Sequence, residues 1–227
     1  MNTSMANAAR LLGAGFRAIL VLTVLTGVLY PLLVTGVAQG LFSHQANGSE
    51  IKADGRSAGS ELIGQRYDLP LKRGQKTAEP DLRWFQPRPS DGLGSNRENG
   101  VNTRYDLQVS GATNLSADNR ELIRAVREAK AAVIEDNSTP GHKVRPQDVP
   151  PDAVTSSGSG LDPHISPQYA RLQAHRVAER NHLSTAVVDR LIARHTDGRL
   201  LGFMGEPRVN VLQLNLALRE VRAGDRG

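Results

Sequence analysis

The stretch that decides the architecture is AILVLTVLTGVLYPLLVTGVAQGLFS, residues 18–43, which contains no Asp, Glu, Lys or Arg. As a helix rising about 1.5 Å per residue, it would reach roughly 39 Å, more than the roughly 30 Å of bilayer hydrocarbon. Residues 44–227 contain no second run of this kind. The sequence therefore predicts one membrane crossing followed by one large water-soluble domain.

A cleavable signal peptide is the alternative interpretation, with Arg10 and Arg17 as its positively charged segment. The apolar run is longer than the roughly 7 to 15 residues of a signal sequence, which favours an uncleaved anchor. Because residues 1–17 carry these two arginines and no acidic residue, we expect a cytoplasmic leader there. Residues 18–43 would then cross a bacterial inner membrane once, and residues 44–227 would form a periplasmic domain.

Composition limits the chemistry of that domain. Hydrophobic residues make up 39% of the chain and aromatic residues only 4%, so a core can form mainly from Leu, Val, Ile and Ala. The absence of Cys excludes disulfides, thiolate metal sites and Cys nucleophiles. The net charge of +5 comes from scattered basic residues with few aromatics between them, which argues against nucleic-acid binding.

The local patterns predict an α+β fold with a helical carboxy-terminal half. Residues 44–102 are rich in Gly, Pro, Ser and Asn, which favours strands and turns, and a short strand is predicted at residues 153–155. A capping box from Asp118 to Glu121 predicts one helix, and Gly198 is placed to close another. The other helix starts are indicated by the capping residues Ser166, Ser184 and Asn210.

One candidate site is the string of small residues from Ser156 to Ser166, whose candidate residues are Ser157, Gly158, Gly160, Asp162 and His164. Their free backbone amides could bind an anion, and the carboxylate and imidazole could assist hydrolysis by a neighbouring Ser. The structural interpretation is a tight turn in which the carboxylate binds backbone amides. We expect the structural role and keep a membrane-anchored periplasmic hydrolase or binding module as the alternative.

A second candidate site is the glycine-rich string of residues 198–211, which contains Gly205, Glu206, Arg208 and Asn210. One interpretation is a tight turn with an exposed Glu206–Arg208 ion pair. The other is a shaped loop presented to a partner protein, which makes these four residues candidates for a partner interface.

Small residues in the apolar run indicate where another membrane helix could pack. Gly36 and Gly40 have GxxxG spacing, and Gly27 is a further small position. We therefore expect these three glycines to contribute to helix packing in the membrane.

The sequence lacks the motifs of ATP hydrolysis and of common metal sites. A P-loop needs a Gly-Lys pair and a phosphorylated pump needs Asp-Lys-Thr-Gly, and neither occurs. The histidines show no HxxxH or HExxH spacing. We therefore expect no catalytic residue, no metal ligand and no cofactor bound by this chain alone.

Several blocks in consistent order resemble the C subunit of the Kdp-type potassium-transporting P-type ATPase. These blocks are Leu29 to Gly36, Phe85 to Ser90, Ser110 to Leu115, Ser156 to Ser166 and Gly198 to Leu218. The resemblance extends from about Leu20 to Leu218, and co-linear blocks are more specific than any one of them.

The resemblance implies a non-catalytic accessory subunit needed for assembly of an inner-membrane complex. Its implied partners are a potassium-channel-like subunit, a P-type ATPase subunit and a small stabilising peptide. It also implies a catalytic chaperone that raises the ATP affinity of the hydrolysing subunit, so ATP would be reached only through the complex. A periplasmic domain could influence that affinity only through the membrane subunits. Another possible role is a lid or filter over the potassium entrance.

Overall fold

The computed structural model describes residues 2–70, 72–73, 75, 78–90, 95–96, 103–104 and 110–224. The chain divides into two compact units, Met1–Ser49 and Glu50–Gly227. The placement of residues 1–17, 18–43 and 44–227 relative to a membrane stays a prediction.

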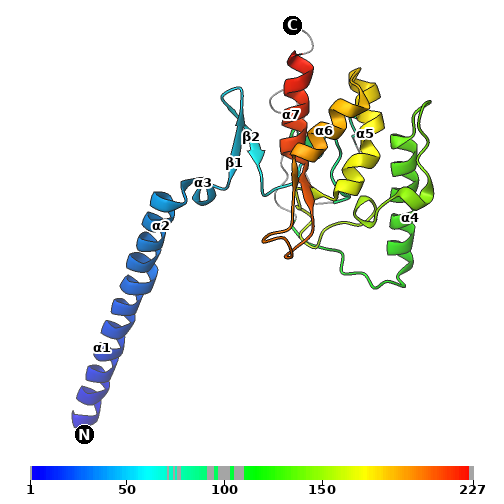
Figure 1. Ribbon diagram of the computed structural model, residues 1–227. Helices are drawn as coiled ribbons and strands as arrows, with labels where there is room; N and C mark the ends of the chain where they lie inside the picture. Colours follow the sequence, from blue (N-terminus) through cyan, green and yellow to red (C-terminus); the bar gives the residue numbers. More distant parts are fainter. Residues whose placement is uncertain are drawn as a thin grey trace. The chain divides into compact units, whose positions relative to one another are not determined.

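The first unit is a long helix with a short helical appendix (Figure 1). It contains α1 (Asn2–Val24), the π-helical turn η1 (Leu25–Leu29) and α2 (Tyr30–Leu41), followed by the single turn α3 (Ser43–Ala46). Phe42 leaves the helical conformation at φ −136° and ψ 43°, which ends the long helix at Leu41, two residues before the charge-free run ends at Ser43. Among the described residues, this is the one helix long and apolar enough to cross a membrane.

The second unit begins with a β-hairpin of β1 (Glu50–Ala53) and β2 (Arg56–Ser60), which pair antiparallel. Asp54 and Gly55 connect them with φ angles of 52° and 74°. Positive φ at both positions is the requirement of a type I′ turn, which Asp-Gly meets at low cost. The strands β3 (Ser95–Asn96) and β4 (Thr103–Arg104) form a second pair. In the described part of residues 44–102, strands and turns therefore predominate as predicted, apart from α3.

The carboxy-terminal half is helical as predicted, and the α+β class is confirmed. Its helices are α4 (Arg120–Asn137), α5 (Pro167–Asn181), α6 (Thr185–Arg194) and α7 (Val211–Gly224). A small antiparallel sheet joins them in the order β5-β7-β6, with β5 (His164–Ile165), β7 (Arg208–Asn210) and β6 (Thr196–Asp197). The capping predictions hold at two helices, since Ser166 Oγ accepts from the Tyr169 N–H and Asn210 Oδ1 accepts from the Gln213 N–H.

The predicted cap of α4 and the predicted strand at residues 153–155 were wrong. The cap of α4 is Asn119, whose side chain accepts from the Glu121 and Leu122 N–H groups, while Asp118 accepts from the Ser116 hydroxyl instead. Residues 151–153 form the 3₁₀ turn η3 (Pro151–Ala153) where a strand was expected at residues 153–155, because the Ala153 N–H donates three residues back to Pro150. Another 3₁₀ turn, η2 (Pro146–Asp148), lies just before it.

Gly198 does not close α6 as predicted. The helix ends at Arg194, and the chain enters strand β6 two residues later, because Thr196 pairs with Val209 of β7. Sheet pairing therefore ends this helix before a glycine cap could act.

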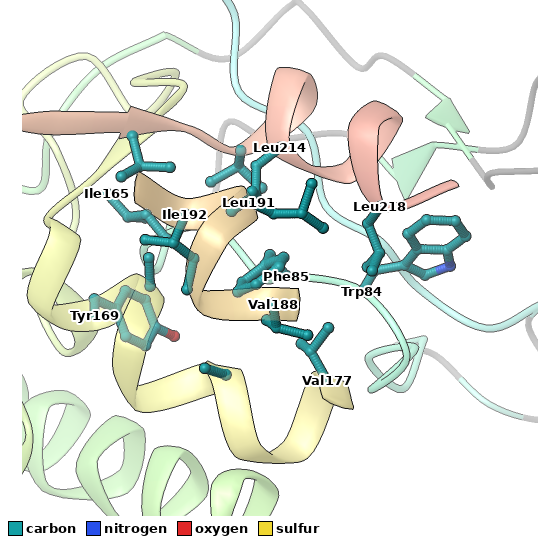
Figure 2. Close-up of a cluster of buried hydrophobic side chains, with 14 of the residues drawn as sticks. Trp84, Phe85, Ile165, Tyr169, Val177, Val188, Leu191, Ile192, Leu214 and Leu218 are labelled. Atoms are coloured by element: carbon teal, nitrogen blue, oxygen red, sulfur yellow. The ribbon is translucent and has the colours of Figure 1, made fainter. Parts of the chain in front are cut away.

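The core lies where α5, α6 and α7 pack around a non-helical segment at Trp84 and Phe85 (Figure 2). Phe85 is fully buried, and side-chain amides satisfy the backbone there. Asn215 accepts from the Phe85 N–H at 2.9 Å and donates to its carbonyl at 2.9 Å. Likewise, Gln173 accepts from the Gln86 N–H at 2.7 Å and donates to the Gln86 carbonyl at 3.0 Å. These two clamps fix the position of the following residues 87–90.

Candidate functional site

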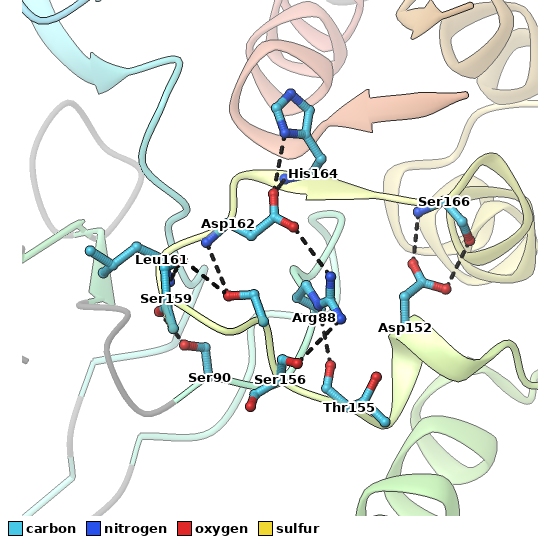
Figure 3. Close-up of polar contacts among 12 residues, drawn as sticks. Arg88, Ser90, Asp152, Thr155, Ser156, Ser159, Leu161, Asp162, His164 and Ser166 are labelled. Carbon is cyan, nitrogen blue, oxygen red and sulfur yellow. Dashed lines mark hydrogen bonds and ion pairs between the residues drawn. The ribbon is translucent and has the colours of Figure 1, made fainter. Parts of the chain in front are cut away.

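The carboxylate of Asp162 joins the Ser156–Ser166 string to a distant arginine (Figure 3). Its Oδ1 accepts from the His164 backbone N–H at 3.0 Å and lies 3.2 Å from the ring Nδ1. Its Oδ2 lies 3.2 Å from Nη1 of Arg88, which the Phe85–Gln86 clamps position. Arg88 also donates to the carbonyls of Thr155 and Ser156, at 3.2 and 3.3 Å. This polar junction holds the string against the segment that carries Arg88.

Further backbone bonds tie the same string to other parts of the domain. The Gly64 N–H donates to Leu161 at 2.8 Å, and the Gly111 N–H donates to Ser159 at 2.8 Å. The Val211 N–H donates to the carbonyl of Pro163 at 3.0 Å, at the start of α7. The string is therefore a structural junction of several segments, which favours the structural interpretation of these residues.

The geometry gives little support to hydrolysis at this site. Gly160 makes the turn with a φ of 69°, and the Ser90 hydroxyl donates to its carbonyl. The Ser157 hydroxyl accepts from the Asp162 N–H at 3.4 Å and faces the Ser159 hydroxyl at 3.4 Å. Gly158 is exposed. The serine hydroxyls recorded here thus contact backbone and each other, while the His164 ring faces the carboxylate.

Hydrogen bonds from His164 and the charge of Arg88 lower the pKa of Asp162 to about 2, against an opposing effect of partial burial. A carboxylate whose pKa is lower in the folded state than in the unfolded state stabilises the fold at pH values above the unfolded pKa, which is 3.8 here. That contribution is lost as pH falls from about 4 to about 2.

We expect Asp162→Asn to lower the free energy of unfolding by about 1 kcal/mol near neutral pH, a value reduced for solvent screening of a partly exposed carboxylate. The difference from wild type should shrink as pH falls from 4 to 2, measured as urea midpoints across that range. Asp197→Asn, on an exposed strand, controls for the substitution itself. A difference that stays constant down to pH 2 would contradict the assignment.

The second candidate site is the connection between β6 and β7, drawn in orange in Figure 1, where it projects from the helices. It has a defined backbone: Leu200 and Met204 exchange hydrogen bonds of 2.8 and 2.9 Å. Leu201, Gly202 and Gly205 have φ angles of 54°, 81° and 79°. Positive φ is ordinary for glycine and uncommon for leucine, so the paired backbone holds Leu201 in this conformation.

Large apolar side chains cover the end of this connection. Their exposed fractions are 66% for Leu200, 77% for Leu201, 72% for Phe203 and 51% for Met204. We call these four residues the apolar tip. Single exposed apolar residues are common, but a contiguous group on one preformed loop is typical of an interaction surface.

The charges beside the apolar tip are paired differently from the prediction. Glu206 Oε2 lies 2.8 Å from Nη2 of Arg199, and Arg208 Nε lies 3.6 Å from Oδ2 of Asp197. The predicted Glu206–Arg208 pair was therefore wrong, because each residue faces a partner across the hairpin. Gly205 lies at the exposed turn, whereas Asn210 is 4% exposed and donates to the Glu61 carbonyl at 2.7 Å.

The sequence reasoning named the polar residues of this loop and missed its apolar tip. The available signal was the run from Leu200 to Met204, enclosed by Gly198 and Gly205. From the sequence alone, such an apolar run would be expected to lie in the core. The structure shows that these side chains are exposed, because the loop projects from the sheet.

A separate cleft lies between α4 and residues 66–68 and 86–90, with a volume of about 310 Å³. Its lining includes Arg66, Asp68, Arg88, Asp136 and Tyr169. Burial raises the pKa of Asp136, with an opposing effect from Arg176. Within the described residues, no group of three or more His, Asp or Glu side chains could hold a metal ion.

The chain thus combines one helix long and apolar enough to cross a membrane, a small α+β domain and a projecting apolar loop. The family model described as "K+-transporting ATPase, c chain" matches residues 12–220. The chain therefore belongs to the KdpC family, as its resemblance implied.

Relatives that carry the KdpC name match this chain over 88% or more of its length. A protein of Streptomyces avermitilis named potassium-transporting ATPase KdpC subunit is 69% identical over 223 residues, which cover 98% of this chain and 99% of that protein. One of Streptomyces coelicolor with the same name is 66% identical over 227 residues and covers all of both chains. One of Caldanaerobacter subterraneus is 44% identical over 201 residues, covering 88% of this chain and 90% of that protein.

Proposed function

We propose that this chain is a non-catalytic accessory subunit of a high-affinity, ATP-driven potassium uptake complex. It spans the inner membrane once through residues 18–43 and places residues 44–227 in the periplasm. The observation that carries the proposal is the apolar tip, a preformed and exposed group of four large side chains on a chain of the KdpC family. Its role is to hold the complex together.

The tip binds a protein surface of the channel-like or ATPase subunit. The charged residues beside it neutralise each other in two ion pairs, Arg199 with Glu206 and Asp197 with Arg208. A surface that binds anionic lipid would carry an excess of positive charge. A preformed apolar loop can instead bind a matching protein pocket with little loss of conformational entropy. The small stabilising peptide completes the set of partners.

An effect on ATP affinity follows if assembly and nucleotide binding are coupled. A periplasmic domain would favour one conformation of the membrane subunits, and that conformation would bind ATP more tightly at the cytoplasmic side. ATP is therefore reached through the complex. The proposal assigns no catalytic residue and no metal to this chain.

The test is a tagged pull-down of the full chain from mildly solubilised membranes of potassium-starved cells, with co-purifying proteins identified by mass spectrometry. We expect a channel-like subunit and a P-type ATPase in fixed ratio with the tagged chain. Recovery of the chain alone would contradict the proposal and favour the anchored hydrolase or binding module.

A further inference from the structure

The long helix of the first unit contains one π-helical turn, η1 (Leu25–Leu29). At its end, the Tyr30 N–H donates to the carbonyl of Leu25, five residues back. Pro31 follows at once, and a proline ring clashes with the carbonyl four residues before it. The wider turn gives that ring room, so the sequence explains why the π turn lies here.

This arrangement leaves two backbone carbonyls without their regular donors. The carbonyl of Thr26 would be bonded by Tyr30 in an α-helix, but Tyr30 donates to Leu25. Residue 31, the donor of a continued π turn, is Pro31 and has no N–H. The carbonyl of Gly27 loses its regular donor for the same reason. We call the carbonyls of Thr26 and Gly27 the bulge carbonyls.

Side chains of the same helix do not replace the missing donors. Ser and Thr hydroxyls reach back three or four residues to a carbonyl. For the bulge carbonyls those positions are Leu29, Tyr30 and Pro31, none of which carries a hydroxyl on Cβ. The Thr26 hydroxyl itself donates to the Leu22 carbonyl at 2.7 Å.

The bulge carbonyls lie at hydrocarbon depth if residues 18–43 span the membrane. Thr26 is eight residues beyond Ala18, or about 12 Å along the helix. Centring a run of roughly 39 Å on roughly 30 Å of hydrocarbon leaves only about 5 Å outside at each end. Lipid chains offer no hydrogen-bond donor, so a neighbouring polar group must satisfy these carbonyls.

We propose that the bulge carbonyls accept a hydrogen bond from a membrane helix of another subunit that carries a hydroxyl, amide or ammonium group at this depth. Gly27 leaves room for that side chain, because a Cβ added there would meet only Cγ2 of Thr23, at 3.9 Å. The inference rests on the proposed function for the span and for the existence of a partner. It adds a specific contact chemistry within the membrane.

The direct test is isotope-edited infrared spectroscopy of the full chain, with the Thr26 carbonyl labelled as ¹³C=¹⁸O by joining a labelled amino-terminal segment to the domain. Leu33, inside the regular helix α2 (Tyr30–Leu41), carries the label in a matched control. In bilayers without partners, we expect the Thr26 carbonyl to absorb at higher frequency than that of Leu33. In the assembled complex it should shift to the Leu33 frequency.

Either of two results would overturn the inference. A Thr26 frequency that is already low in the chain alone would mean that water or the chain itself satisfies the carbonyl. An unshifted high frequency in a complex that does form would mean that no partner donor reaches it. Failure of the wild-type chain to enter the complex would instead contradict the proposed function, and this inference with it.

A substitution gives a second readout. Pro31→Ala restores an N–H that closes the helix onto the bulge carbonyls, while Leu33→Ala removes side-chain volume one half-turn later without changing the backbone. We expect Pro31→Ala to weaken retention in the detergent-solubilised complex by about threefold, and at most about twentyfold, the range for hydrogen bonds between membrane helices. Equal retention of the two variants would count against the inference.

Discussion

Replacing Arg176 with Met is expected to lower the free energy of unfolding of the domain by about 3 to 5 kcal/mol. Arg176 is 1% exposed on α5. Its Nε donates to Asn137 at 2.8 Å, its Nη2 donates to Gln173 at 2.6 Å, and its Nη1 donates to the carbonyls of Leu82 and Trp84. Met would fill much of the volume but remove the donor to Asn137 Oδ1 and to the Trp84 carbonyl, whereas Gln173 Oε1 would keep the Gln86 N–H.

The charge of Arg176 persists despite its burial. Burial lowers its pKa to about 10, so the guanidinium remains protonated at neutral pH. Its recorded hydrogen bonds go to neutral oxygens, which means that the cation is stabilised by carbonyl and amide dipoles arranged around it. Arg176→Lys should also be destabilising, because a single ammonium cannot reproduce the planar fork of donors.

The single tryptophan of the chain, Trp84, makes the measurement direct. It is 6% exposed and Arg222 lies over its ring at 5.1 Å, so its fluorescence reports the core contacts that Arg176 supports. Urea unfolding of the full chain in detergent should show a lower midpoint for Arg176→Met with an unchanged slope. Arg180→Met, exposed on the same helix, is the matched control. Equal midpoints for the two variants would contradict the role given to Arg176.

The helices of the domain could be predicted because their signals are local. Ser166 followed by Pro167 places a hydroxyl and a ring where the first turn of α5 needs them. Asn210 supplies an amide oxygen at the start of α7. The apolar spacing behind each cap then indicates the buried face. Such patterns require only that residues a few positions apart share one element.

The clamps around the core segment at Trp84 and Phe85 could not be predicted in this way. Gln173, Arg176 and Asn215 occupy ordinary helical positions, where polar residues indicate a solvated face. They bind the backbone of residues 82–86, which lie 87 to 130 positions away for the Gln173 and Asn215 contacts. No local pattern reports a contact at such separation, so these buried polar residues were missed.

In the glycine-rich hairpin too, local sequence patterns did not predict the contacts of the candidate interface. Glu206 and Arg208 are close in sequence, which suggested a pair, but the turn places Arg199 opposite Glu206. Residues that face each other across paired strands come closer than residues two apart on one strand. The apolar tip likewise depends on how the turn directs Leu201 and Phe203, which the spacing of glycines alone does not determine.

The double substitution Leu201→Ser and Phe203→Ser is expected to weaken association with the membrane subunits by about a hundredfold or more. Burying each of these side chains in a partner surface contributes at least about 1.5 kcal/mol, so the pair contributes about 3 kcal/mol. The loss would appear as a fall in channel-like and ATPase subunits recovered with the tagged chain after mild solubilisation. It should be accompanied by lower high-affinity potassium uptake.

A folding defect would give the same loss of recovery, so the fold must be measured separately. Leu201 and Phe203 are 77% and 72% exposed, and exposed substitutions ordinarily change the free energy of unfolding by less than about 0.5 kcal/mol. We therefore expect an unchanged Trp84 unfolding midpoint. Leu62→Ser, at a residue 59% exposed on another loop, is the matched control and should leave recovery unchanged. Full recovery of the double variant would rule out the apolar tip as the docking surface, because a stable interface cannot lose two buried anchors of this size without effect.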